Sequence, residues 1–443
     1  MLTFAVCRRD PELVTPAAST PHETKPLSDH DTLRFHVPTA FFYRGGRRLH
    51  DPAAVIRRAL GEALVPYHPL AGRLREVEAR KLVVDCTGEG VLFVEADADV
   101  RLAELEAAAG RLAPPIPCMD QLLFDVEGSS GILNCPMLLI QVTRLLCGGY
   151  VFALRVNHAI CDATGIGQFI SAVTELARGL PSPTVTPAWS RELLEARNPP
   201  RPSFAHREYD AAPPLPAPPG DTVSRSFTFT RANIAVIKAA LPTDLRDKTT
   251  AFEALAAAVW RAHTAALDFP ADDELRLVFV ANFRRVRELG LPVGYYGNAC
   301  VLVMAVTTVG KLRAGSLAGA VELVREAKAA MTAEYVRSTA DFLLLHGRPR
   351  LAMAENLLLL SDTRHAGFRR LDFGWGEPVY GGSVHMQPGV SVINAVRNGD
   401  GEDELVVPLM MPRPAMDRFA SEIEMLVKGS APSAINPALY TSV

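Results

Sequence analysis

The chain has 443 residues, about three times the ~150 typical of one domain, and 48% of them are hydrophobic against 21% charged. This composition excludes disorder over most of the length and predicts two domains or one unusually large one. The formal net charge of −3 excludes the broadly basic surface of a protein that binds nucleic acid or anionic membranes, so any anionic ligand needs a local basic cluster.

Cysteine usage and the chain ends predict a reduced, cytoplasmic protein. The seven cysteines are an odd number without a CxxC pair, and the first residues lack the pattern of a signal peptide. Residues 440–443 do not form a peroxisomal Ser-Lys-Leu signal, so a peroxisomal location would need another one. The most apolar stretch, 128–154, is interrupted by polar residues and glycines, which predicts two buried strands rather than a membrane span.

In chain order, the hydrophobic spacing predicts mixed α/β (α+β) structure. Helices are expected at residues 52–64, 164–177, 250–267 and 317–336, and strands at 81–86, 91–95, 150–156 and 275–280. No fixed-period repeat is found, which argues against a solenoid or a propeller.

Proline marks the domain boundary. Eleven of the 34 prolines lie at residues 181–220, where an even spread gives roughly three, and such a segment supports neither a continuous helix nor a central strand. Its aromatic residues Trp189, Phe204 and Tyr209 indicate that it packs along the surface. We therefore expect an N-terminal domain (1–180), a crossover (181–224) and a C-terminal domain (225–443).

The segment with the clearest chemistry is an HxxxD pattern, His158-Ala159-Ile160-Cys161-Asp162, between a predicted strand and a predicted helix. An imidazole held in such a turn can project into a cleft, and it is the side chain best suited to take a proton near neutral pH. Asp162 is expected to anchor the turn or to cap the helix. Spacing alone leaves open the alternative that His158 is a hydrogen-bonded core histidine and Asp162 only a cap.

Other chemistries find less support. The HxxxD pair supplies two metal ligands and no second cluster at ligand spacing is found, so no metal site is predicted. The patterns GxSxG, GxxxxGK[ST] and GxGxxG are absent from the sequence, which weakens the serine hydrolase, P-loop and dinucleotide hypotheses.

Two further segments contain unusual residue combinations. Asp372-Phe373-Gly374-Trp375-Gly376 is typical of a tight, aromatic-rich loop. Residues 282–287 contain three arginines and precede the aromatic turn at 294–298. The arginines suit phosphate groups, although a solvated face is the commoner outcome.

Together these motifs resemble the plant BAHD acyltransferase family, whose signatures are HxxxD and DFGWG. Both are intact, in the family's order, with the YYGN turn (295–298) between them. Further matches extend from residues 27–29 and 67–74 to Pro408 and residues 415–416, so the resemblance covers nearly the whole chain. It implies two chloramphenicol-acetyltransferase-like domains joined by a long crossover, with a channel between them that admits acyl-CoA from one face and an alcohol from the other.

The resemblance also implies roles for the motif residues. His158 is the general base, and Asp162 turns away from the substrate and orients the turn through a salt bridge, with Gly165 beside it. Asp372 is expected to pair with Arg284 in a structural role, together with Gly374. Trp375 and Asn298 are candidates for the channel and for an oxyanion donor.

Substrate contacts are implied less directly. Lys248, Thr250, Ser361 and Asp362 are the candidates for CoA binding, and His36, Phe41 and Gln387 those for the acceptor pocket. Thr363 stands where the family often has tryptophan, and the proline-rich lead into the YYGN turn is reduced to Leu291-Pro292. Both places border regions that the family uses for CoA or for loop packing.

Within the family, residues 2–6, 11–14 and 294–299 are most similar to enzymes that benzoylate benzyl alcohol. The resemblance therefore implies a monomeric enzyme that uses benzoyl-CoA as a co-substrate, without a permanently bound cofactor. The alternatives are an N-acyltransferase or an acetyl, aliphatic or hydroxycinnamoyl transferase of the same family. Outside it stand a thioester hydrolase and a non-catalytic binding module.

Overall fold

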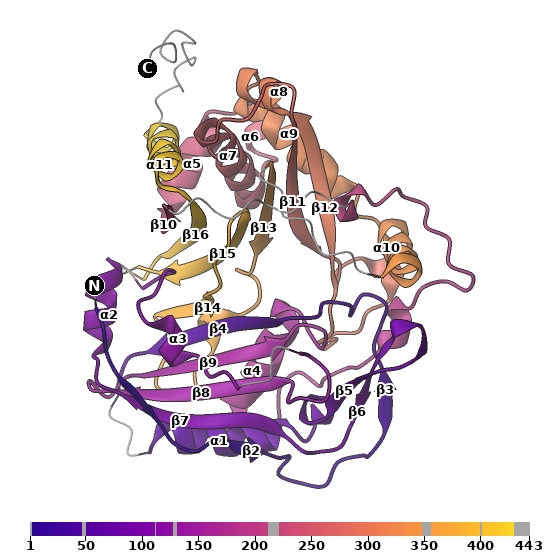
Figure 1. Cartoon of the computed structure of the whole chain (residues 1–443), viewed down its shortest axis with the longest axis vertical. Helices are drawn as coiled ribbons and strands as arrows, with labels where there is room; N and C mark the ends of the chain where they lie inside the picture. The colour runs from indigo at the N-terminus through magenta and orange to yellow at the C-terminus, as the bar shows by residue number, and fades with distance from the viewer. Residues whose placement is uncertain are drawn as a thin grey trace.

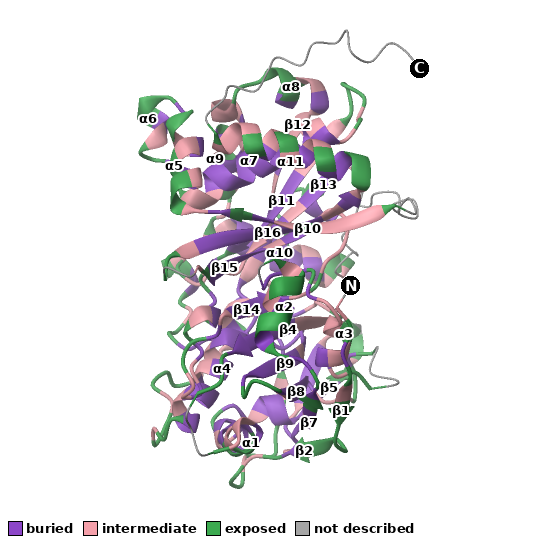
Figure 2. Ribbon diagram, turned by 90° about the vertical axis from the view of Figure 1, so that its left-hand side faces the viewer, coloured by how far each residue is buried: buried purple, intermediate pink, exposed green. Residues whose placement is uncertain are grey.

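The structure is a computed structural model that describes residues 2–46, 50–110, 112–126, 131–210, 221–347, 356–398 and 401–428. Two large sheets are arranged one above the other, the N-terminal one in the lower part of Figure 1 and the C-terminal one in the upper part. Buried residues follow the strands of both sheets, and exposed residues lie on outer helices such as α2 (Figure 2). The mixed α/β prediction is confirmed.

The N-terminal sheet has seven strands in the order β1-β7-β8-β9-β4-β14, with β2 paired to β7. Its strands are β1 (Val6–Arg8), β2 (Glu12–Val14), β4 (His36–Tyr43), β7 (Val91–Ala98), β8 (Leu138–Leu145), β9 (Tyr150–Asn157) and β14 (Tyr380–Ser383). Strands β4 and β9 are antiparallel, so the start of β4 lies beside the end of β9. This register brings His36 next to the residue that precedes His158.

Helices and a small sheet complete the N-terminal half. The helices are α1 (Pro52–Ala63), α2 (Leu102–Ala109), α3 (Met119–Leu122) and α4 (Ala163–Ala177). The small sheet is formed by β3 (Thr24–Pro26), β5 (Arg73–Glu76) and β6 (Leu82–Asp85). Helices α1 and α4 pack against each other along apolar faces that join the same core as the strands.

The C-terminal sheet has six strands in the order β10-β16-β15-β13-β11-β12. They are β10 (Thr222–Phe229), β11 (Glu274–Asn282), β12 (Cys300–Thr308), β13 (Leu357–Asp362), β15 (Val390–Arg397) and β16 (Asp403–Pro412). The helices are α5 (Arg231–Ala239), α6 (Thr243–Arg246), α7 (Ala251–Ala266), α8 (Val309–Ala314), α9 (Leu317–Ala329), α10 (Ala333–His346) and α11 (Arg413–Val427).

One predicted helix is wrong in its extent. The pattern at 317–336 predicts a single helix, but α9 ends at Ala329 and α10 begins at Ala333. Thr332 causes the break because its side chain accepts a hydrogen bond from the backbone N–H of Tyr335, which is the geometry of a helix N-cap.

The predicted domain boundary also needs correction after residue 365. Phe368, Leu371 and Phe373 are buried in the N-terminal core, and β14 pairs with β4 at the edge of the N-terminal sheet. Residues 225–443 are therefore not one spatial unit, because the chain returns to the N-terminal half and then re-enters the C-terminal sheet at β15.

The crossover packs on the folded surface as predicted. Trp189 donates through its indole N–H to the carbonyl of Pro26, and Arg197 pairs with the buried Asp341 of α10 at 2.7 Å. Tyr209 is buried and stacks on Phe342. The proline-rich residues 211–220 and the C-terminal residues 440–443 lie outside the described ranges.

Candidate active site

His158 lies where β9 ends, in the short turn that leads into α4. Its backbone N–H donates to the carbonyl of Phe35 at 2.9 Å, which ties the turn to the residue before β4. The Phe35 ring lies edge-on to the imidazole, with ring centroids 5.2 Å apart, and is 49% exposed. The imidazole itself is partly exposed. Strand pairing therefore holds this ring at the end of the sheet within reach of solvent.

The amide of Asn298 determines which nitrogen of His158 carries the proton. Asn298 Nδ2 donates to Asp31 Oδ1 at 2.8 Å and to the carbonyl oxygen of His158 at 2.9 Å, so its Oδ1 must face the ring. The distance from Asn298 Oδ1 to His158 Nδ1 is 3.1 Å. We therefore assign the Nδ1–H tautomer, in which Nε2 carries the lone pair that a general base needs.

These contacts correct the prediction that Asn298 supplies an oxyanion donor. The side chain is 3% exposed, and both amide hydrogens point at Asp31 and at the carbonyl oxygens of the HxxxD turn. No donor remains for a substrate oxygen. Asn298 acts on the imidazole instead.

Asp162 both caps α4 and joins the two halves of the chain. Its Oδ1 accepts the backbone N–H of Gly165 at 2.9 Å, and its carboxylate binds Arg284 through two hydrogen bonds of 2.7 and 2.9 Å. Burial alone would raise the pKa of Asp162, but Arg284 and the backbone N–H groups of Ala299 and Gly165 outweigh it and hold this pKa below its usual range. The expected salt bridge of Asp162 is present, and its partner is Arg284.

Gly165 allows the helix to approach the YYGN turn closely. A Cβ at this position would lie 1.9 Å from the carbonyl oxygen of Tyr296. Only glycine fits such a contact without a shift of the backbone. The glycine that follows the HxxxD motif is therefore required for docking the motif onto the C-terminal half.

The DFGWG segment is a loop, as predicted, but Asp372 does not pair with Arg284. Its Oδ1 accepts the backbone N–H groups of Gly374 at 2.6 Å and Gly376 at 2.8 Å. Gly374 has a φ of 107° and Gly376 one of 96°, conformations that favour glycine. The predicted Arg284–Asp372 pair is therefore wrong, because Asp162 already occupies the guanidinium and Asp372 organises its own loop.

Trp375 lies far from His158. Its ring contacts Tyr150 at the start of β9, with centroids 5.5 Å apart, whereas His158 follows the end of that strand. Seven residue steps along β9 correspond to roughly 23 Å. Trp375 therefore does not lie beside His158 and is no candidate for an oxyanion donor there, and its place at the channel stays a prediction.

Two predicted CoA-binding residues lie at the N-terminus of α7. Thr250 is the N-cap: its Oγ1 accepts the backbone N–H of Glu253 at 3.2 Å, and the Glu253 carboxylate accepts the N–H of Thr250 at 2.8 Å. Lys248 is exposed two residues earlier. This end of a 16-residue helix carries a partial positive charge and a nearby cation.

The other two CoA candidates end β13. Asp362 binds Arg364 through its carboxylate, with contacts of 2.8 and 2.5 Å, and Ser361 is partly exposed beside it. An ion-paired carboxylate repels a phosphate, so Asp362 suits a structural role at this strand end.

The start of α7, with two of the CoA candidates, and the end of β13, with the other two, are linked through β11. The ring of Phe252 on α7 lies 5.4 Å from that of Phe279, whose strand partner is Leu360 next to Ser361. At the end of β11, Asn282 donates to Thr164 of α4 at 3.3 Å. The carboxyl ends of β11 and β13 therefore lie at the junction that holds the HxxxD turn.

The three acceptor candidates divide into two groups. His36 pairs with Asn157 across β4 and β9, and its Nε2 is buried without a hydrogen-bond partner among the described residues. Burial lowers the pKa of His36. Gln387 follows β14 on the side where that strand runs toward the start of β4, and it hydrogen-bonds His385 at 3.1 Å.

Phe41 is not available to a substrate. It is 0% exposed, and its ring packs in the N-terminal core against Phe152 and Phe368. Its assignment to the acceptor pocket is wrong because β4 turns this side chain into the core.

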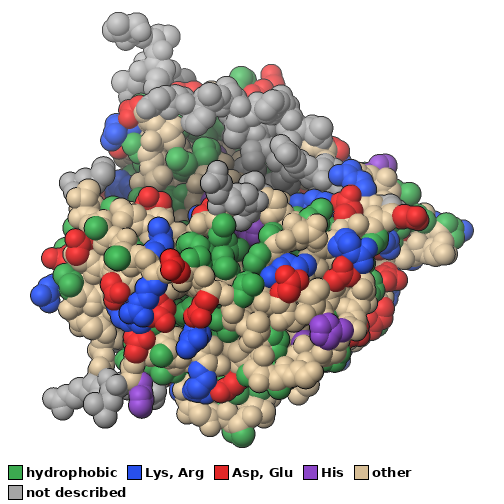
Figure 3. Space-filling model, turned by 60° about the horizontal axis from the view of Figure 1, so that its bottom comes forward, with side chains coloured by type: hydrophobic (Ala, Val, Ile, Leu, Met, Phe, Trp, Pro, Cys, Tyr) green, Lys and Arg blue, Asp and Glu red, His purple; other side chains and the backbone are tan. Residues whose placement is uncertain are grey.

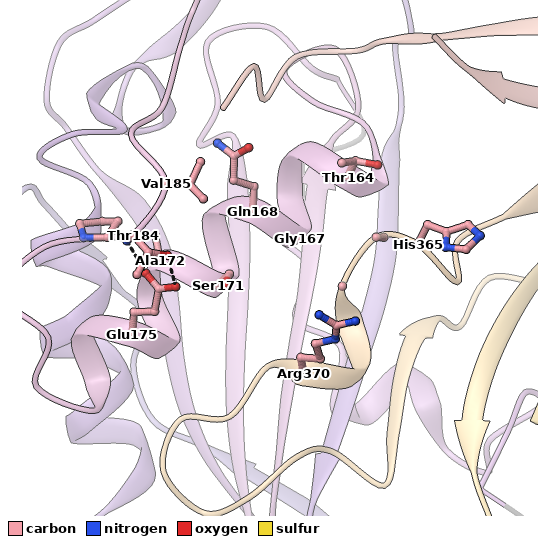
Figure 4. A pocket seen from close by; sticks show the side chains of 13 residues that line it. Thr164, Gly167, Gln168, Ser171, Ala172, Glu175, Thr184, Val185, His365 and Arg370 are labelled. Carbon is pink, nitrogen blue, oxygen red and sulfur yellow. Dashed lines mark hydrogen bonds between the residues drawn. The ribbon is translucent and has the colours of Figure 1, made fainter. Parts of the chain in front are cut away.

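A separate pocket of about 280 Å³ lies along the outer face of α4 (Figure 4). It is lined by Thr164, Gln168 and Ser171 of the helix and by His365 and Arg370 of a later loop, among others. None of the predicted site residues lines it. In the described part of the chain, no three His, Cys, Asp or Glu side chains converge as a metal site.

Sequence reasoning missed two buried charges at this site. Asp31 is 1% exposed and contacts Asn298, and Arg191 of the crossover is 1% exposed and pairs with Asp31 at 2.7 Å. Neither lies in a marked motif. The only signal in the sequence was an arginine within the proline-rich segment. Its burial, which only the structure shows, distinguishes Arg191 from a charge on the surface.

The fold is shared with two solved structures. The crystal structure of vinorine synthase matches over 95% of this chain and 98% of its own, with a TM-score of 0.74 and 22% identity. That of TRI101 from F. graminearum, complexed with coenzyme A and deoxynivalenol, matches over 90% and 97%, with a TM-score of 0.70 and 15% identity.

The sequence comparison defines the family. Residues 4–426 match the profile of the Transferase family, and the chain belongs to this family, the BAHD acyltransferases. It is 47% identical to benzyl alcohol O-benzoyltransferase of Petunia hybrida, over 97% of this chain and 95% of the relative. It is 46% identical to (Z)-3-hexen-1-ol acetyltransferase of Arabidopsis thaliana, over 95% of each. The chain is therefore an acyltransferase that uses acyl-CoA.

Proposed function

We propose that this protein transfers the benzoyl group of benzoyl-CoA to benzyl alcohol or a similar alcohol, with His158 as the general base. The observation that carries the mechanism is the Asn298–His158 contact, which leaves the lone pair on Nε2 of a partly exposed ring. The choice of substrates is supported by the 47% and 46% identity to the benzyl alcohol O-benzoyltransferases of Petunia hybrida and Nicotiana tabacum.

The proposed reaction is a direct transfer. Nε2 of His158 takes the hydroxyl proton as the alcohol oxygen attacks the thioester carbonyl. The tetrahedral intermediate then collapses, the C–S bond breaks, and the CoA thiolate recovers the proton from the imidazolium. Holding both substrates beside one base supplies the orientation that makes the attack fast. No acyl-enzyme is required, since the alcohol itself is the nucleophile.

The surroundings of His158 favour an apolar acceptor. Phe35 is half exposed and lies edge-on to the imidazole. Its ring offers an aromatic surface to whatever approaches the base, and aromatic pairs stabilise one another by about 0.5–1.5 kcal/mol beyond burial. An aromatic alcohol suits this surface better than a charged or heavily hydroxylated one.

The donor is proposed to bind at the C-terminal side of the junction. Lys248 and the N-terminus of α7 supply positive charge for phosphate groups. The charged side chains on the face shown in Figure 3 are of both signs and interspersed, which agrees with a ligand that needs only a local basic site.

His158→Ala tests this function. With benzoyl-CoA and benzyl alcohol, the rate of CoA thiol release is expected to fall ~10²- to 10⁴-fold, the usual contribution of a general base. His22→Ala, which changes an exposed histidine outside the site, is the control. Near-wild-type turnover of His158→Ala would disprove the mechanism.

A substrate panel separates the alternatives. The 46% identity to an enzyme named for acetylation of (Z)-3-hexen-1-ol makes an acetyl or aliphatic transfer the second candidate. Acetyl-CoA and amine acceptors therefore belong in the panel, and a blank without alcohol detects thioester hydrolysis.

Among the described residues, no helix has the length and apolar character that a membrane span requires. The cytoplasmic location and the monomeric state stay predictions.

A further inference from the structure

A buried carboxylate lies behind Asn298. The Asp31 side chain is 0% exposed, in the loop before β4. Its Oδ1 accepts the backbone N–H of Asn298 at 3.2 Å and the side-chain amide at 2.8 Å. Its Oδ2 accepts the N–H of Ser28 at 3.0 Å and its hydroxyl at 2.7 Å. Every partner is a donor, so the group is an ionised carboxylate, which only accepts.

Arg191 balances this charge and ties it to the catalytic turn. Its Nη1 donates to Asp31 Oδ2 at 2.7 Å, and its Nη2 donates to the carbonyl of Ile160 within the HxxxD motif at 2.7 Å. Burial alone would lower the pKa of Arg191, but Asp31 outweighs it and the pKa is raised. A Cβ on Gly297 would lie 1.9 Å from Nη1, so the glycine before Asn298 makes room for the guanidinium.

We propose that Asp31, held by Arg191, is a positioning residue for the base and acts through the Asn298 amide. The inference rests on the role of His158 proposed above. The amide of Asn298 has two orientations that differ by a half-turn. In the observed one its NH₂ group faces Asp31 and its oxygen faces His158 Nδ1.

The charge of Asp31 selects between these orientations. In the observed orientation the NH₂ group of Asn298 donates to the Asp31 carboxylate and to the carbonyl oxygen of His158. In the flipped orientation the amide oxygen would face these two acceptors and repel them. The flipped amide would also point a donor at Nδ1, which moves the ring proton to Nε2 and removes the lone pair that takes the alcohol proton. Neutralising Asp31 weakens the preference for the productive orientation.

The chain offers a matched control for this carboxylate. The Asp341 side chain is also 0% exposed and pairs with a crossover arginine, Arg197, at 2.7 Å. It accepts the backbone N–H groups of Arg197 and Arg201 at 2.7 and 2.8 Å. Asp341 lies on α10, outside the site. Asp341→Asn therefore reproduces the loss of a buried crossover ion pair without touching Asn298.

The test compares Asp31→Asn with Asp341→Asn in the full-length protein, at a temperature where circular dichroism shows each to be folded. We expect Asp31→Asn to lower kcat roughly 100-fold, as loss of orientation does, while KM for both substrates stays within about two-fold. Asp341→Asn should retain wild-type kcat. Arg191→Gln removes the positive charge that balances the buried Asp31 carboxylate, so it should lower kcat as well. This variant replaces Asp31→Asn in the test if Asp31→Asn does not fold.

Histidine-selective ¹⁵N NMR supplies a readout that loss of stability does not move. The ring couplings of His158, assigned from the His158→Ala spectrum, should show Nδ1–H in wild type and a shift toward Nε2–H in the folded Asp31 or Arg191 variant. Nε2–H in wild type would overturn the proposal, as would an unchanged tautomer or unchanged kcat in those variants. The measurement needs no substrate, so it stands apart from failure of the benzoyl or benzyl assignment.

Discussion

The two sequence motifs each contain one aspartate, and the two carboxylates have different environments. Asp162 is 5% exposed, caps α4 and binds Arg284 from the other half of the chain. Asp372 is partly exposed, and its carboxylate accepts the N–H groups of Gly374 and Gly376 in its own loop, while its backbone carbonyl accepts a hydrogen bond from Arg178 at the end of α4. The carboxylate of the HxxxD motif thus joins the two halves of the chain, whereas the carboxylate of the DFGWG motif stabilises the turn of its own loop.

The distance of each motif from the proposed base, His158, follows the same division. Asp162 lies four residues after His158, in the same turn. The backbone carbonyls of this turn accept hydrogen bonds from Arg191 and Asn298. The DFGWG loop lies at the other end of β9, where Tyr43 donates through its hydroxyl to the carbonyl of Leu371 at 2.7 Å. A motif can therefore be diagnostic of a family while it supports the fold rather than the chemistry.

The largest effect expected from this comparison is that of Asp162→Ala. It leaves Arg284 buried without its carboxylate, and breaking a buried pair from one side costs about 3–5 kcal/mol. Urea unfolding measures the change in free energy. Asp372→Ala, which removes only a local cap, should cost about 1–2 kcal/mol.

An exposed pair serves as the control for Asp162→Ala. Arg413 and Asp221 are 3.0 Å apart with side chains 60% and 61% exposed, so Arg413→Ala should change the free energy of unfolding by less than about 1 kcal/mol. Equal losses for Asp162→Ala and Asp372→Ala would contradict the division between a contact that joins the two halves and a local one.

A smaller loss of stability is expected from Gly165→Ala, which tests the close contact between α4 and the YYGN turn. The added methyl group would meet the carbonyl of Tyr296 and push α4 from the YYGN turn, at a cost of about 1–3 kcal/mol. Gly319→Ala is the control, because its Cβ meets only the Ser316 hydroxyl at 3.8 Å near the start of α9. The control should be neutral or stabilising in thermal unfolding. Wild-type stability of Gly165→Ala would show that the contact is loose.

The smallest effect concerns acid pH. The pKa of Asp162 is lower in the folded protein than its unfolded value of about 3.9, so this stabilisation is present above about pH 4 and is lost as pH falls below it. The free energy of unfolding should therefore fall more steeply between about pH 4 and 2 in wild type than in Asp162→Asn. Parallel curves for the two proteins would contradict the lowered pKa.

Local patterns were sufficient to predict most of the elements named from the sequence and to single out His158, the proposed base. The predicted helix at 52–64 and the predicted strand at 150–156 agree with α1 and β9 to within a residue or two, because hydrophobic periodicity and caps act over a few neighbouring residues. His158 was identified from the turn between β9 and α4. The single long helix at 317–336 failed because Thr332 starts a new helix inside the periodic pattern.

The sequence by itself determined the mixed α/β class, the family and the identity of the proposed base, since these depend on residue types at short spacing. Only the tertiary structure decided which polar groups meet: Arg284 with Asp162 rather than Asp372, and Asp31 with both Arg191 and Asn298. Asp31 and Asn298 are 267 residues apart in the chain. No periodicity spans such a separation, and a buried carboxylate takes the donors that folding brings to it.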